Sequence, residues 1–122
     1  MGRHIKTIFD SEINAFIVRM PEYVTLNELR VWSQEFLEAL GERAGKEKVA
    51  LLMDTYRHQF ESIECLKFLR DFLSNEWQIK NCISKVAFVQ PRQNREPEVA
   101  SPKEAYFSVF TEAHNWLRQQ LN

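Results

Sequence analysis

The sequence predicts one α/β domain, spanning residues 1–122, in which helices pack on a single mostly parallel sheet of about five strands. Three observations lead to this prediction. The chain of 122 residues is close to the usual size of one domain. Short runs of β-branched and aromatic residues alternate with stretches of helical hydrophobic periodicity. The run Val49 to Met53 is apolar throughout, which is typical of a central strand covered on both faces.

Two strands joined by a short turn are expected at the start of the chain. Residues 4–9 and 13–20 are rich in β-branched and aromatic side chains, and residues 10–12 between them are turn-forming. Only antiparallel strands can be joined so tightly, so these residues are predicted to form a hairpin at one edge of the sheet. Pro21 then ends the second strand because it lacks a backbone donor.

A capping box predicts where the first helix begins. The Thr25 hydroxyl can accept a hydrogen bond from the backbone of Glu28, and the Glu28 carboxylate can accept one from the backbone of Thr25. The helix is expected to end between Gly41 and Gly45. Its apolar side chains recur at helical spacing and form one stripe: Leu29, Trp32, Phe36, Leu37 and Leu40.

A second helix is predicted from Ser62 to about Trp77, after a polar loop at residues 54–61. Either Glu61 or Ser62 can cap it. Its apolar residues cover more than half of the helix circumference, which one sheet face rarely needs: Ile63, Cys65, Leu66, Phe68, Leu69, Phe72 and Leu73. The excess can pack on the first helix or form a dimer surface. The three tryptophans, Trp77 among them, are expected to pack in the core or between a helix and the sheet.

The rest of the chain is expected to contribute two strands, a long loop and a closing helix. Residues 83–89 and 105–110 have the composition of strands. Residues 90–104 contain three of the four prolines and little that could enter a core, so they are predicted to form a loop with room for little more than a helical turn. Thr111 is expected to cap the closing helix.

Composition argues against several classes of protein. The 16 basic and 17 acidic residues leave a net charge of −1, whereas a nucleic-acid-binding protein usually has a basic excess. No apolar run approaches the roughly 20 residues needed to span a bilayer, and Met1 to Phe9 do not have the pattern of a signal peptide. No metal-ligand spacing or glycine-rich phosphate loop is present, so neither a metal nor a cofactor is expected. We therefore expect a cytoplasmic protein with two reduced cysteines.

Along nearly the whole chain, this order of elements resembles the SpoIIAA-like family of STAS domains, which have the fold of anti-sigma-factor antagonists. The resemblance lies in the opening hairpin, the capped helix, the strand Val49–Asp54 followed by a polar loop and an apolar helix, and the closing stretch Tyr106–Leu121. It implies a non-catalytic regulatory domain that binds protein partners or small ligands.

The resemblance also implies a phosphoacceptor at the start of the second helix. Switch proteins of this group have a serine there, in an Asp-Ser-x-Gly context. Ser62 matches the serine and Glu61 is a loose match for the Asp, whereas Glu64 occupies the place of the Gly. Acidic neighbours repel a phosphate, although a helix N-terminus attracts it. The alternative is that Ser62 is a plain N-cap.

A candidate ligand site is expected where two predicted parallel strands end. Ligands of open α/β sheets bind beyond the carboxyl ends of the strands. If the strands that end at Met53 and Val89 are neighbours, their loops meet, and with the N-terminus of the second helix they can bind an anion. The alternative is a solvated edge whose charges pair casually. The charged side chains of the two loops are Asp54, Arg57, His58, Arg92 and Arg95.

Two mechanisms fit a non-catalytic STAS-like domain. A protein partner can dock near the start of the second helix, at Glu61 and Ser62, or an apolar ligand can enter between that helix and the sheet. One alternative is a small enzyme that uses His58 with Asp54 or Arg57. Another is a structural homodimer formed through the second helix.

Overall fold

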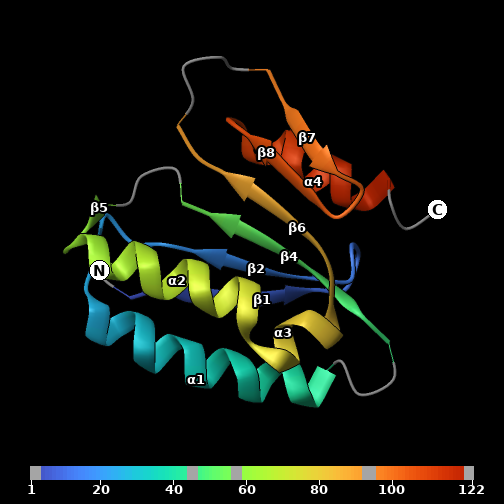
Figure 1. The fold of residues 1–122 in the computed structure, drawn as a ribbon. Helices are drawn as coiled ribbons and strands as arrows, with labels where there is room; N and C mark the ends of the chain where they lie inside the picture. Colours follow the sequence, from blue (N-terminus) through green and yellow to red (C-terminus); the bar gives the residue numbers. More distant parts are fainter. Residues whose placement is uncertain (1–3, 44–46, 56–58, 92–95, 120–122) are drawn as a thin grey trace.

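The computed structural model describes residues 4–43, 47–55, 59–91 and 96–119. These residues form four helices: α1 (Leu26–Arg43), α2 (Ile63–Asn75), α3 (Trp77–Cys82) and α4 (Phe110–Gln119). A six-stranded sheet has the order β1-β2-β4-β6-β8-β7, and β3 and β5 pair separately (Figure 1). The strands are β1 (Lys6–Asp10), β2 (Ala15–Arg19), β3 (Tyr23–Val24), β4 (Val49–Asp54), β5 (Gln59–Phe60), β6 (Ile83–Val89), β7 (Glu98–Ser101) and β8 (Glu104–Phe107).

The six-stranded sheet is mixed. The inner pairs β2–β4, β4–β6 and β6–β8 are parallel, whereas the edge pairs β1–β2 and β7–β8 are antiparallel. The predicted hairpin at the start of the chain is therefore confirmed. Its turn uses Asn14 in the left-handed region, with φ of 52°, and the carboxylate of Asp10 accepts from the backbone of Glu12 at 2.9 Å.

β4 lies between β2 and β6, as its uninterrupted apolar sequence predicts. Val49, Leu51 and Met53 belong to the core on one face of the sheet. Ala50 and Leu52 belong to the core on the other face. A strand with helices on both sides cannot alternate between apolar and polar residues, which explains the sequence VALLM.

The capping box at the start of α1 is formed as predicted. The backbone N–H of Glu28 donates to the Thr25 hydroxyl at 3.1 Å, and the backbone N–H of Thr25 donates to the Glu28 carboxylate at 3.1 Å. Trp32 is buried, and its indole N–H donates to the Thr7 hydroxyl on β1 at 2.9 Å. The apolar stripe of α1 thus packs on the face of the sheet near β1 and β2.

The prediction of a loop over residues 90–104 is wrong in part, because this segment contains β7. Pro97 and Pro102 flank β7 and do not interrupt it, so they remove no hydrogen bond from its pairing with β8. The crossover from β6 to β8 therefore passes through an edge strand. The last strand ends at Phe107, earlier than predicted, and α4 begins at Phe110, one residue before the predicted cap.

The second predicted helix is α2, which ends at Asn75, and the chain bends at Glu76 into a further short helix, α3, that was not predicted. Glu76 is extended, with φ of −68° and ψ of 122°, so α3 runs in a new direction and buries Ile79. Trp77 is consequently 74% exposed, and its predicted place in the core is wrong. Trp32 is buried and Trp116 packs partly against the core, as expected.

α4 covers the opposite face of the sheet from α1 and α2 (Figure 1). His114 on α4 lies 3.1 Å from the Asp10 carboxylate at the end of β1. This hydrogen bond lowers the pKa of Asp10 below its ordinary value of 3.8, against the opposing effect of burial. The stabilisation is therefore present above about pH 4 and is lost as the pH falls through the lowered pKa.

The central position of β4 predicts a large cost for Leu51→Ala. Leu51 is fully buried between the sheet and the α1–α2 layer, so the substitution should lower the free energy of unfolding by about 2–5 kcal/mol in chemical denaturation. Val31→Ala is the control, because Val31 on α1 is 50% exposed and should cost less than about 0.5 kcal/mol. Equal costs for the two variants would contradict the placement of β4.

Candidate functional site

The two halves of the sheet are covered differently on the side of α1 and α2. These helices lie over β1, β2 and β4 (Figure 1). Over β8 and β7, no helix of the described part of the chain lies on this side, because α4 packs on the opposite face. A step therefore exists between the outer side of α2 and the sheet.

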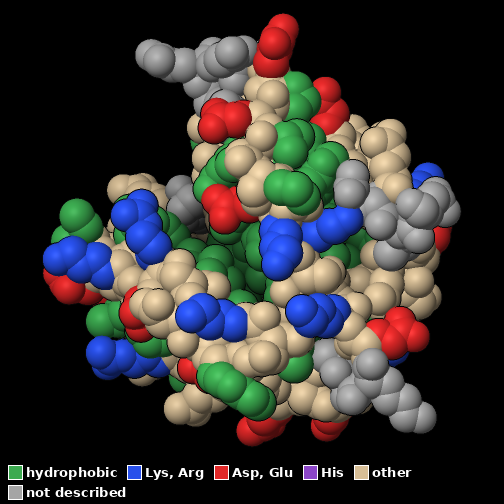
Figure 2. Space-filling view, turned by 45° about the vertical axis from the view of Figure 1, so that its right-hand side comes forward, with side chains coloured by type: hydrophobic (Ala, Val, Ile, Leu, Met, Phe, Trp, Pro, Cys, Tyr) green, Lys and Arg blue, Asp and Glu red, His purple; other side chains and the backbone are tan. Residues whose placement is uncertain are grey.

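A hollow of about 280 Å³ occupies this step. Figure 2 shows it as a depression with hydrophobic side chains at its base and basic side chains along part of its rim. We call this hollow the α2 groove. Its apolar wall and floor come from α2, β5, β6 and β8: Phe60, Leu66, Leu69, Leu73, Val86, Phe88 and Tyr106.

The wide apolar arc predicted for the second helix is divided between two surfaces. Phe72 packs against Trp32 and Phe36 of α1, with ring centroids 5.6 and 6.4 Å apart. Leu66 and Leu73, on the adjacent side of α2, line the groove. One sheet face does not need so wide an arc, and here the excess serves both α1 and the groove.

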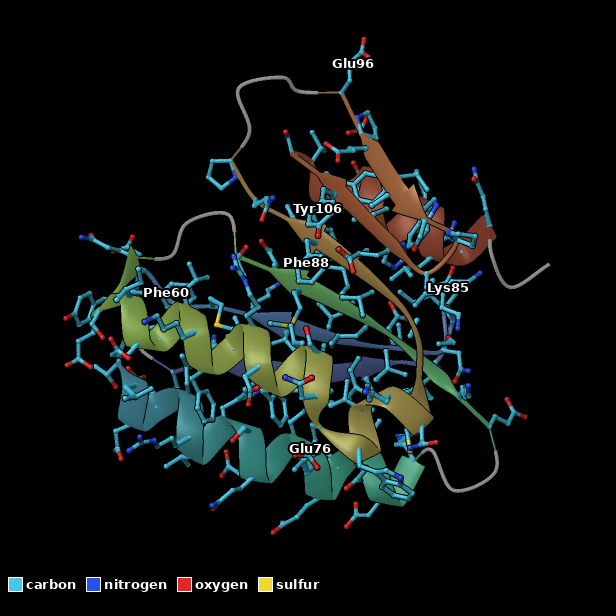
Figure 3. All side chains as sticks on the ribbon, viewed as in Figure 1. Phe60, Glu76, Lys85, Phe88, Glu96 and Tyr106 are labelled. Atoms are coloured by element: carbon cyan, nitrogen blue, oxygen red, sulfur yellow. The ribbon has the colours of Figure 1, made fainter. Side chains whose placement is uncertain are left out.

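The floor of the groove is an aromatic pair on neighbouring strands. Phe88 on β6 is directly opposite Tyr106 on β8, and their rings stack with centroids 5.2 Å apart and an interplanar angle of 13°. Figure 3 shows the two labelled side chains near each other on the neighbouring strands β6 and β8. Because both strands belong to the hydrogen-bonded sheet, this floor is fixed in position.

Charged side chains from α2 and from β8 line the groove. The Tyr106 hydroxyl donates to the Glu104 carboxylate on the same strand. Burial raises the pKa of Tyr106 to about 12, helped by the hydrogen bond to Glu104 and by the charge of Glu98, while the Arg70 charge opposes this shift. Arg70 reaches the groove from α2, and within the described ranges it forms no ion pair.

The carboxyl ends of the parallel strands meet at one edge, as predicted. Backbone hydrogen bonds continue beyond the strands, from Met20 N–H to the Asp54 carbonyl at 3.0 Å and from Thr55 N–H to the Val89 carbonyl at 2.9 Å. The predicted strands that end at Met53 and Val89 are therefore neighbours with a common rim.

Asp54 lies in a second hollow, of about 410 Å³, at this rim. Its carboxylate is 3.8 Å from the Arg19 guanidinium, which also lies over the Phe110 ring at the start of α4. The other predicted members of the anion site lie outside the described residues, so that site remains a prediction: Arg57, His58, Arg92 and Arg95.

Glu61 and Ser62 lie at the start of α2, close to the start of α1. The Glu61 carboxylate accepts from the backbone N–H of Leu26 at 3.0 Å and so caps α1. Ser62 occupies the N-cap position of α2, but its hydroxyl makes no capping hydrogen bond. The serine is exposed, and its proposed role as phosphoacceptor remains a prediction.

Comparison with family models, with curated proteins and with solved structures gives no match for this chain. Among the helices described, none is both long enough and apolar enough to cross a membrane. In the same residues, no group of three or more histidine, cysteine or acidic side chains is arranged to bind a metal ion.

Sequence reasoning missed the polar residues of the groove. Glu104 falls in the segment predicted to be a loop, and Arg70 on the second helix was not among the predicted site residues. One signal was available: Glu104 and Tyr106 are two residues apart, so on a strand they share a face.

The raised pKa of Tyr106 predicts that its hydroxyl ionises at a higher pH than an ordinary tyrosine. In an absorbance titration of tyrosinate, one tyrosine should ionise near pH 12, and this phase should be absent in Tyr106→Phe. Glu104→Gln should lower the pKa only in part, because burial remains. The folded pKa exceeds the ordinary value of 10.0, so stability should fall as the pH rises from about 10 to about 12. Persistence of the late phase in Tyr106→Phe would refute the assignment.

Proposed function

We propose that this protein is a non-catalytic binding domain that takes a small apolar compound into the α2 groove. One observation carries the proposal: a hollow of about 280 Å³ separates the leucines of α2 from the stacked Phe88–Tyr106 floor. Pockets for small molecules are concave, mainly apolar and supplied with a few polar groups. The groove has each of these features.

The walls of the groove come mainly from a packed helix and from paired strands. α2 is anchored on α1 by the aromatic contacts of Phe72, and Val86 and Phe88 belong to a strand paired on both sides. Most residues that line the hollow therefore belong to helices and strands, and Thr55 and Gln90 follow directly after β4 and β6. A ligand that enters a preformed pocket loses less free energy to ordering the protein.

The chemistry of the groove supports binding without catalysis. Its described titratable side chains are Arg70, Glu104 and Tyr106. Arginine does not exchange its proton near neutral pH, and the raised pKa of Tyr106, about 12, keeps its hydroxyl protonated, so neither is a general base there. The Glu104 carboxylate already accepts a hydrogen bond from Tyr106. The alternative of an enzyme that uses His58 concerns residues outside the described ranges and remains a prediction.

A second candidate is protein docking at the start of α2, as the STAS resemblance implies. It is favoured by apolar side chains that are exposed there: Ile63 is 65% exposed and Tyr23 on β3 is 51% exposed. Ser62 immediately precedes Ile63, so a phosphate on this serine would change the charge of the surface. In the simplest form of this docking hypothesis, the partner is a second copy of this chain.

Indole, a neutral apolar probe, tests the groove. Its titration should give saturable shifts of the amide NMR signals of Leu69, Phe88 and Tyr106. Leu66→Trp should fill the mouth of the groove and weaken binding at least about tenfold, which corresponds to about 1.4 kcal/mol. Ile63→Trp is the matched control, because Ile63 is exposed on the same helix and does not line the groove. An equal loss of indole affinity in both variants, or the absence of saturable NMR shifts in the wild-type protein, would exclude the proposal.

Sedimentation velocity over a range of concentrations tests docking of a second copy. The wild-type chain should form a dimer that Ile63→Glu abolishes, because a buried unpaired carboxylate is costly. Val31→Glu, at an exposed position on α1, should leave the dimer intact. A wild-type chain that stays monomeric at every concentration would remove this form of the docking hypothesis.

A further inference from the structure

The mouth of the α2 groove has a basic wall on the helix. Arg70 is four residues from Leu66 and three from Leu73, so these side chains share one face of α2. Arg70 is exposed and has no ion-pair partner in the described ranges. A guanidinium at the rim of an apolar hollow can bind a carboxylate through two parallel hydrogen bonds.

The opposite wall is acidic and comes from the β7–β8 hairpin. Glu104 lines the groove, and one of its carboxylate oxygens accepts from the Tyr106 hydroxyl. An ionised carboxylate has further acceptor capacity, which suits an ammonium group. Glu98, directly opposite Tyr106 in the antiparallel register, adds a second negative charge to this side.

A ligand with only one charge does not satisfy both walls of the groove. An apolar carboxylate would pair with Arg70 but would be repelled by Glu104 and Glu98. An apolar amine would pair with Glu104 but would leave Arg70 without a partner. A ligand that carries both charges on neighbouring atoms satisfies both walls, while its apolar part can lie over the Phe88–Tyr106 floor.

We propose that the α2 groove binds a free apolar or aromatic amino acid as its zwitterion. Arg70 receives the carboxylate, Glu104 receives the ammonium group, and the side chain lies between the leucines of α2 and the aromatic floor. This inference rests on the proposed binding function of the groove. The volume of about 280 Å³ is at the lower end for small-molecule pockets and suits a single amino acid better than a lipid.

The test compares L-phenylalanine with two analogues that each lack one charge, hydrocinnamate and phenethylamine. Affinities are measured by amide NMR titration and calorimetry, with indole as the neutral probe. L-Phenylalanine should bind at least about tenfold more tightly than either analogue, because a site built for a polar group discriminates against ligands that lack it. Its shifts should map to Leu69, Phe88 and Tyr106.

Two variants test which side chain binds which charged group of the ligand. Arg70→Gln should weaken L-phenylalanine about tenfold without weakening phenethylamine, and Glu104→Gln should weaken it about tenfold without weakening hydrocinnamate. Lys67→Gln is the control, since Lys67 is on the same helix but does not line the groove, and it should change none of the affinities.

The outcomes separate this inference from the function on which it rests. If indole binds in the groove but L-phenylalanine binds no more tightly than both analogues, the zwitterion is excluded and the apolar pocket is kept. If Arg70→Gln weakens the amine as much as L-phenylalanine, the charge assignment is wrong. If neither indole nor any of the three charged compounds binds, the proposed function and the inference both fail.

Discussion

Burial of β4 on both faces is the constraint on which the rest of the structure depends. Helices must lie on both sides of this strand, yet the two layers do not cover the same half of the sheet. On one face α4 contacts β4, β6 and β8, whereas on the other face α1 and α2 lie toward β1 and β2. One half-face, formed by part of β6 with β8 and β7, is consequently left without a helix in the described structure, and the α2 groove follows from this offset.

On the uncovered half-face, the side chains become more polar with increasing distance from the core. A single cross-strand row passes from Met53 on β4 to Phe88 on β6, Tyr106 on β8 and Glu98 on β7. Its members change from fully apolar to aromatic with a hydroxyl and then to charged. Such a gradient gives a floor that is apolar where α2 overhangs it and polar where water reaches it. Glu104 accepts from the partly buried tyrosine hydroxyl, so the floor keeps its polar atom paired.

Features encoded by local sequence could be predicted, whereas those that depend on distant partners could not. The Thr25–Glu28 capping box and the apolar run of β4 each carry their signal within a few residues, and both are confirmed. β7 carries no such signal, because its edge position leaves Val99 exposed between two prolines. The bend at Glu76 uses neither glycine nor proline, so the exposure of Trp77 could not be foreseen. The groove could be anticipated only through the wide apolar arc of α2.

The two candidate functions are linked by α2, which forms one wall of the groove and begins at the exposed Ile63. Phe72 and Cys65 pack this helix on α1 and on the sheet, and Glu61 just before it caps α1. A compound in the groove could therefore influence a partner at Ser62 and Ile63 only by shifting α2 as a whole. Close packing resists such a shift. The geometry thus favours a preformed pocket over a ligand-driven switch, unless a change of charge at Ser62 first weakens the contact between the starts of the two helices.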